Sequence, residues 1–192
     1  MEADWSAEVG GDLPLIAVPW AGFVDLRSHP EGVSGIAEAA AYPALREALI
    51  LLNRPGAPVF TSKCDVWTLE RAEIDPYEFD CDTEDGGTGV ASYIDVIARD
   101  AAVFGAFDRH EAWVRFTTQA LRRLPVRNGR VDLTIRAASL DARMEREFGF
   151  GVTLYAAGCG ASADAALTAW GAVLLAAVTA TMNTGVLLNA GE

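Results

Sequence analysis

The chain has 192 residues and a formal net charge of −12 at pH 7, from 27 acidic and 15 basic residues. Its length predicts a single globular domain, residues 1–192, with one core that folds without a metal or a disulfide. The acidity argues against a protein that binds DNA, RNA or anionic membranes, because their phosphate groups would repel it. Three cysteines without a CxxC pair are typical of reduced thiols, so we expect a cytoplasmic protein.

The first 30 residues predict little regular structure. Residues 1–12 carry no clear pattern, so we expect an irregular N-terminal segment. The apolar run at 13–18 predicts a short edge strand, because the missing N–H of Pro14 is tolerated at the edge of a sheet.

Two short helices are predicted next, separated by a proline. Ser34 is expected to cap a helix over 36–41. Pro43 suits the first position of a second helix, since that position needs no backbone N–H. The buried face of this second helix is expected to hold Leu45, Leu49 and Leu52.

Residues 58–69 are rich in β-branched and aromatic side chains, which predicts a strand. Alternation assigns to its core face Phe60, Ser62, Cys64 and Val66. It assigns to the other face Thr61, Lys63, Asp65 and Trp67. Lys63 is the only lysine of the chain, and an ammonium group can lose its proton when buried, whereas a guanidinium cannot.

An acidic stretch follows at 70–90 and predicts a surface loop, since it ends in glycines and its carboxylates repel one another. Its clustered carboxylates are Asp80, Asp82, Glu84 and Asp85. Oxygen atoms of this kind suit calcium or magnesium, but the spacing is not that of an EF-hand. Neither His29 nor His110 lies in a metal-binding spacing, so we predict no metal site.

Two further helices are predicted, over 91–103 and over 108–124. In the second, Asp108 and Glu111 have the spacing of a capping box. Its buried stripe is expected to contain Trp113, Phe116, Ala120, Leu121 and Leu124.

The C-terminal part predicts a hairpin and a helix. Residues 130–136 and 150–157 alternate as two half-buried strands that we expect to pair antiparallel. A tight turn at 158–160 should lead into a final helix capped by Ser162. This helix carries no charge after Asp164 until the last residue, but its alanine, threonine and glycine content predicts a buried core helix rather than a membrane span.

The predicted fold is therefore α+β, with three or four mostly antiparallel strands and helices packed on one face. If the predicted strands share one sheet, its second face collects charged, hydroxyl and aromatic side chains, a mixture typical of a ligand site. An exposed tryptophan on such a face indicates that something covers it. The predicted ligand-binding residues are Lys63, Asp65, Trp67, Asp132, Arg136 and Tyr155.

The leading functional hypothesis is a soluble binding or protein-interaction domain that self-associates, since no catalytic or cofactor motif is present and closed dimers are common. The glycine pattern at 158–163 lacks the following acidic strand of a dinucleotide site, so no cofactor is predicted. A small-molecule ligand remains possible under this hypothesis.

Two alternatives stay open. The first is a small-molecule enzyme in which Lys63 acts as base or nucleophile, Asp65 and Asp132 handle protons, and Arg136 holds an anionic substrate. The second is an acidic partner or inhibitor of a basic protein, because the net charge favours such a complex.

Overall fold

The structure is a computed structural model that describes residues 1–11, 14–81, 87–142 and 145–185. The described strands are β1 (Glu2–Glu8), β2 (Ile16–Val18), β3 (Val59–Leu69), β4 (Thr88–Ala98), β5 (Gly129–Ala142) and β6 (Glu145–Gly160). The described helices are α1 (Ala37–Ala41), α2 (Pro43–Asn53), α3 (Ala101–Phe104), α4 (Phe107–Arg122) and α5 (Ala163–Gly185). Two 3-10 turns accompany them, η1 (Pro30–Gly35) and η2 (Arg71–Glu73).

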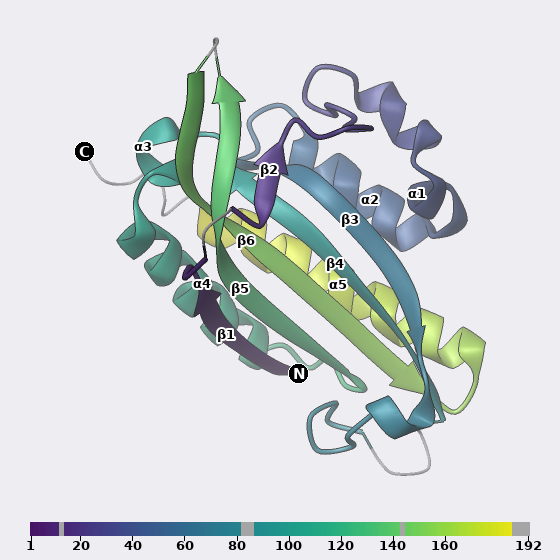
Figure 1. Ribbon diagram of the computed structural model, residues 1–192. Coiled ribbons are helices and arrows are strands. Elements are labelled where there is room, and N and C mark those ends of the chain that lie inside the picture. Colours follow the sequence, from purple (N-terminus) through teal and green to yellow (C-terminus); the bar gives the residue numbers. More distant parts are fainter. Residues whose placement is uncertain (12–13, 82–86, 143–144, 186–192) are drawn as a thin grey trace.

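The fold is α+β, as the sequence predicts, but the sheet is larger and mixed. Within the described residues it has six strands, in the order β1-β5-β6-β4-β3 with β2 also beside β5 (Figure 1). The pairs among β3, β4, β6 and β5 are antiparallel, whereas β1 and β2 both run parallel to β5. The prediction of three or four mostly antiparallel strands is therefore wrong in strand number and in direction.

Strand β4 accounts for part of this difference, because the sequence predicts a helix over 91–103. The strand lies between β6 and the edge strand β3 and is buried on both faces, with only Thr88 and Tyr93 partly exposed. Burial on both faces removes the alternation of polar and apolar residues that identifies a strand at the surface. A continuous apolar run of this kind cannot be distinguished from a buried helix by periodicity.

The N-terminal segment accounts for the rest. Residues 2–8, predicted to be irregular, form strand β1, which pairs residue by residue with β5 from Arg130 to Arg136. The partner lies more than 120 residues away in the sequence, so no local pattern signals the pairing. The edge strand predicted at 13–18 is confirmed for Ile16–Val18, and residues 12–13 lie outside the described part of the chain.

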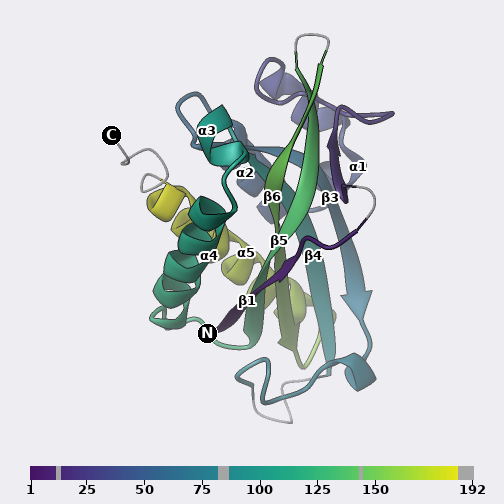
Figure 2. The ribbon, with the colours of Figure 1, turned by 60° about the vertical axis from the view of Figure 1, so that its left-hand side comes forward.

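The helices α2, α4 and α5 cover one face of the sheet, as predicted (Figure 2). The central helix is α5, whose Trp170 is buried and donates from its indole N–H to Ser92 Oγ at 2.9 Å. A Cβ on Gly158 would lie 2.2 Å from the backbone nitrogen of Trp170, so this glycine permits the close approach of α5 to β6. The turn predicted at 158–160 is instead the buried end of β6, and it holds Cys159.

Among the described helices, α5 is long and apolar enough to cross a membrane by length and composition. Its packing is that of a core helix, since one side is buried against the sheet and between α2 and α4. The buried residues of this side include Trp170, Val173, Leu174, Ala177 and Val178.

The sequence predicts the capping or first residue of four helices, and the structure agrees with two of these predictions. Pro43 begins α2, and Ser162 Oγ accepts a hydrogen bond from the backbone of Ala165 at the start of α5. Ser34 and Asp108 do not cap helices, because α1 begins at Ala37 and α4 at Phe107, both without a side-chain cap.

The predicted apolar faces are largely confirmed. Leu45, Leu49 and Leu52 of α2 are fully buried, and Trp113 and Leu121 of α4 are buried too. Phe116, predicted to be buried, is 51% exposed.

A β-bulge in β3 changes the predicted face of its first residues. The pairing with β4 shifts between Thr61 and Cys64, so two residues of β3 lie opposite one residue of β4. Thr61 therefore points to the helical layer, where its hydroxyl accepts a hydrogen bond from Asn53 Nδ2 at 2.8 Å. Phe60 points to the opposite face and packs with Ile97, so its predicted assignment is wrong.

The charged residues 139–147 extend the β5–β6 hairpin, apart from residues 143–144, which lie outside the described part. The hairpin projects beyond the neighbouring strands (Figures 1 and 2). Across it, Arg146 Nε donates to Asp141 Oδ1 at 2.7 Å.

Candidate functional site

The face of the sheet opposite the helices, which we call the open face, is covered at both ends and uncovered between them. Figure 1 looks onto this face. At one end the chain crosses from β2 toward β3, and Ile16 and Val18 pack against Phe60 and Ile97. At the other end residues 71–81 fold over the sheet, and Ile74 and Phe79 pack on Cys159. The stretch predicted as a loop at 70–90 thus contributes to a small core, and its last residues belong to β4.

The uncovered part holds a cavity of about 550 Å³, which we call the sheet-face groove. Its lining comes from β1, β3, β4, β5, β6 and residues 78–79, and includes Trp67, Glu78, Arg130, Asp132, Arg136 and Tyr155. Four of the six predicted ligand-binding residues are in this set. The open face is therefore neither fully covered nor fully bare.

Three aromatic rings form a row across neighbouring strands of the open face. Trp67 and Tyr93 have ring centroids 6.3 Å apart, and those of Tyr93 and Tyr155 are 6.1 Å apart. Cross-strand neighbours on one face of an antiparallel sheet come within this range, which explains how alternating positions in three strands assemble the row. Trp67 is 38% exposed, so the row ends at a surface that a partner can reach.

The arginines of the groove are both paired with carboxylates. Arg136 Nη1 donates to Glu8 Oε2 at 2.6 Å, and its Nη2 donates to the Tyr155 hydroxyl at 3.1 Å. Arg130 donates to Asp132 at 2.6 Å and lies 2.8 Å from Glu78. The hydrogen bond to Asp132 raises the pKa of Arg130 further. Neither guanidinium is therefore a free cation for an anionic substrate.

A buried carboxylate, Asp95 of β4, lies in the same face and is missing from the predicted site. Thr153 Oγ1 donates to Asp95 Oδ1 at 2.6 Å. Burial raises the pKa of Asp95. The hydrogen bond from Thr153 and the positive charges of Arg136 and Lys63 act in the opposite direction and lower this pKa, but burial has the larger effect. The sequence signal was a single charged residue inside the apolar run 94–98, which the helix prediction obscured.

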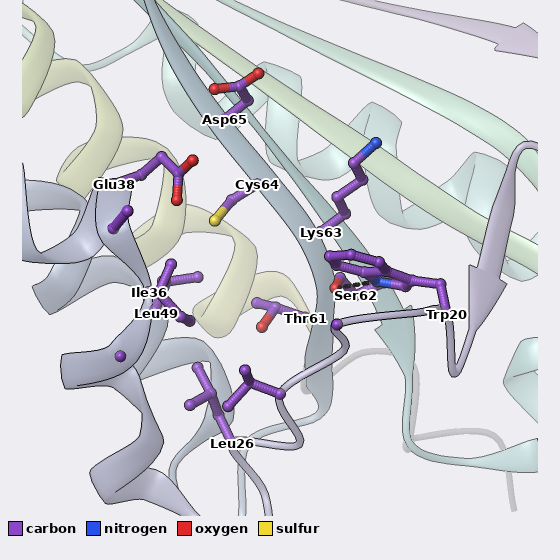
Figure 3. Close-up of a pocket in the computed structure, with 14 residues that line it drawn as sticks. Trp20, Leu26, Ile36, Glu38, Leu49, Thr61, Ser62, Lys63, Cys64 and Asp65 are labelled. Carbon is purple, nitrogen blue, oxygen red and sulfur yellow. Dashed lines mark hydrogen bonds between the residues drawn. The ribbon is translucent and has the colours of Figure 1, made fainter.

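Lys63 and Asp65, the other two predicted residues, lie at the margin of the open face. They line a second cavity of about 340 Å³ beside the bulge of β3, which we call the edge pocket (Figure 3). The side chain of Lys63 is exposed, and its Nζ lies 6.0 Å from the ring centroid of Trp20. The indole N–H of Trp20 donates to the backbone oxygen of Ser62 and fixes residues 19–26, which we call the covering segment, to β3.

The edge pocket also contains a cysteine. Burial raises the pKa of the Cys64 thiol to about 12, with further contributions from the carboxylates of Glu38, Asp65 and Asp95. A thiol with this pKa stays protonated at neutral pH and is a poor nucleophile. Cys64 is therefore a structural residue, as the sequence predicted for a core position.

Within the described ranges, no group of three or more histidine, cysteine, aspartate or glutamate side chains is arranged to hold a metal ion. Asp80 lies 3.9 Å from Arg127. The carboxylates at positions 82, 84 and 85 lie outside these ranges. His110 is fully buried between aromatic rings, with Nδ1 2.9 Å from the carbonyl oxygen of Ala106.

Comparison of the chain with protein-family models, curated proteins and solved structures finds no match in any of the three. The function of the protein has to be inferred from its own residues.

Proposed function

We propose that this protein is a nonenzymatic binding domain whose sheet-face groove receives a basic, exposed segment of a partner protein. The observation that carries this proposal is an aromatic row on an open face beside the most acidic part of the chain. The proposal combines the predicted binding domain with the predicted acidic partner of a basic protein.

The negative charge of the chain is concentrated next to the groove. Residues 65–85, which we call the acidic segment, contain nine acidic residues and one basic residue, Arg71, so they carry −8 of the net charge of −12. The described part of this segment begins in β3 and covers one end of the open face, where Glu78 lines the groove. A local excess of one sign attracts partners of the opposite sign and accelerates their association.

The groove itself also carries more negative than positive groups. Among its described side chains and those beside it, three cations, Lys63, Arg130 and Arg136, accompany five carboxylates. These carboxylates are Glu8, Asp65, Glu78, Asp95 and Asp132. Aromatic faces add to this preference, because lysine and arginine side chains bind over tryptophan and tyrosine rings.

The alternatives are less well supported by the same residues. A lysine that acts as a base or nucleophile near neutral pH has to be desolvated or crowded by cations, whereas Lys63 is exposed and has acidic neighbours. Self-association through the groove would bring two acidic segments together, and like charges oppose such an interface. Self-association would therefore require another surface of the protein.

Fluorescence anisotropy with a labelled peptide of alternating lysine and valine tests the proposal. We expect binding that weakens steeply as NaCl increases from about 50 to 300 mM, because the attraction is screened. Trp67→Ala should weaken binding by roughly tenfold, because tryptophan is among the side chains whose removal costs an interface most.

Phe116→Ala is the matched control, since it removes an exposed aromatic side chain from α4 in the opposite layer. It should leave the affinity unchanged. Equal losses in both variants, or binding that does not respond to salt, would show that the peptide does not use the groove.

A further inference from the structure

We propose that the edge pocket is a separate binding site for a small organic cation, namely an amine attached to a short apolar body. The inference does not depend on the function proposed for the groove. The pocket lies at the bulge of β3 and is bounded by α1, α2 and the covering segment (Figure 3).

The size of the edge pocket suits a small ligand. Its volume of about 340 Å³ lies at the lower end of the range for small-molecule sites, roughly 300–1,000 Å³. The bulge helps to form it, because the register shift turns Thr61 toward Asn53 of α2, while the next residue, Ser62, donates from its hydroxyl to the backbone oxygen of Ala17 on the opposite side of the strand. Bulges are frequent beside functional sites, where they redirect side chains.

One end of the pocket is apolar. Leu26, Ile36 and Leu49 come from the covering segment, the start of α1 and the buried face of α2 (Figure 3). Leu26 and Leu49 are buried and Ile36 is half-buried. A hydrocarbon or aromatic body placed here would lose its contact with water, which stabilises binding by about 25 cal/mol for each Å² of apolar surface buried.

The other end is negative. Glu38 lies beside Cys64 on the side of α1, and Asp65 follows Cys64 along β3 (Figure 3). Within the described part of the chain, neither carboxylate has a salt bridge. Lys63 also lines the pocket, but its ammonium group lies across β3, beside the ring of Trp20, and Arg27 pairs with Asp25 at 2.7 Å.

The state of the Cys64 thiol agrees with a negative potential inside the pocket. Burial is the main reason that its neutral form is favoured over the thiolate, and three carboxylates add to this effect. The same potential would favour an ammonium group and oppose an anion. A neutral apolar molecule would fill the cavity but leave the carboxylates without a partner. An amine with an apolar body satisfies both ends.

The test uses phenethylamine and its neutral analogue 2-phenylethanol, with methyl NMR of the full chain as the readout. At about 1–10 mM, the range in which fragments of this size bind, phenethylamine should shift the methyl signals of Leu26, Ile36 and Leu49. It should also slow the reaction of Cys64 with a thiol reagent. The alcohol should bind roughly tenfold more weakly, since it lacks the charge.

Glu38→Gln should remove the preference for the amine while retaining the shape of the pocket. Glu47→Gln is the control, because Glu47 is an exposed carboxylate on α2 and does not line the pocket. The methyl spectrum of each free variant shows whether it is folded. Equal binding of amine and alcohol, or methyl shifts that are the same in Glu38→Gln and in the control, would overturn the proposal.

Discussion

At the residue scale, the most informative side chain is one that the sequence did not single out. Asp95 is a carboxylate buried in a sheet face, held by Thr153 and near two cations. Its raised pKa means that the folded protein binds a proton more tightly at this site than the unfolded chain does. The contribution of Asp95 to stability is therefore greatest below its ordinary pKa of 3.8 and is lost as pH rises through the raised value.

We expect Asp95→Asn to be more stable than the natural sequence at pH 7, with a Tm several degrees higher, because the amide is neutral and still accepts from Thr153. The difference should shrink as pH falls toward 4. Calorimetry of both proteins between pH 4 and pH 8 measures it. Asp65→Asn, which changes an exposed carboxylate, should show no comparable pH-dependent gain, and a destabilised Asp95→Asn would mean that the two cations outweigh burial.

At the scale of elements, the contact between β6 and α5 is the least tolerant of change. Gly158 and Gly160 lie in the strand, and a Cβ on either would fall within 3 Å of backbone atoms of α5. Backbone atoms cannot move aside as the end of a flexible side chain can, so a methyl group has to displace the helix.

Gly158→Ala should destabilise the protein by about 3 kcal/mol or more, the upper range for overpacked positions. Urea unfolding followed by tryptophan fluorescence would measure the loss. Gly10→Ala is the control, since nothing lies within 4 Å of its Cβ position, and it should change the stability by less than about 0.5 kcal/mol. Similar values for the two variants would contradict the close packing of α5 on β6.

At the scale of the whole molecule, charge is unevenly distributed. The acidic segment holds two thirds of the net charge, whereas most arginines lie elsewhere and several pair with carboxylates. Repulsion within such a region opposes the compact state and is screened by salt.

We therefore expect the Tm to rise by about 2–5 °C between low salt and about 0.5 M NaCl, equivalent to roughly 1 kcal/mol for a chain of this size. Thermal unfolding by circular dichroism measures the shift. Sodium chloride is preferred to sulfate, because sulfate stabilises proteins by exclusion from their surface. A Tm that falls with salt would indicate that ion pairs such as Arg136 with Glu8 dominate over the repulsion.

The sequence by itself identified the helices and strands that are buried on one face and exposed on the other. The alternation at 130–136 and at 150–157 identified the central hairpin, and the leucine spacing of α2 and the tryptophan stripe of α4 identified their buried faces. Alternate side chains of a strand point to the same face, so the sequence assigned five of the six predicted site residues, all except Lys63, to a sheet face by their spacing from buried residues. The side chain of Lys63 also lies on the predicted face, although the bulge interrupts the alternation at this position.

Only the tertiary structure decided the rest, because the information is not local. Strand β4 is buried on both faces, so its sequence shows no alternation of polar and apolar residues. Strand β1 forms because it pairs with β5, which is distant in the sequence. The bulge lies where Asn53 binds Thr61, and the two cavities exist because separate segments cover the ends of the open face and the edge of β3. The sequence pattern indicates which face of a helix or strand is buried. A binding site depends in addition on which distant segments of the chain cover that face.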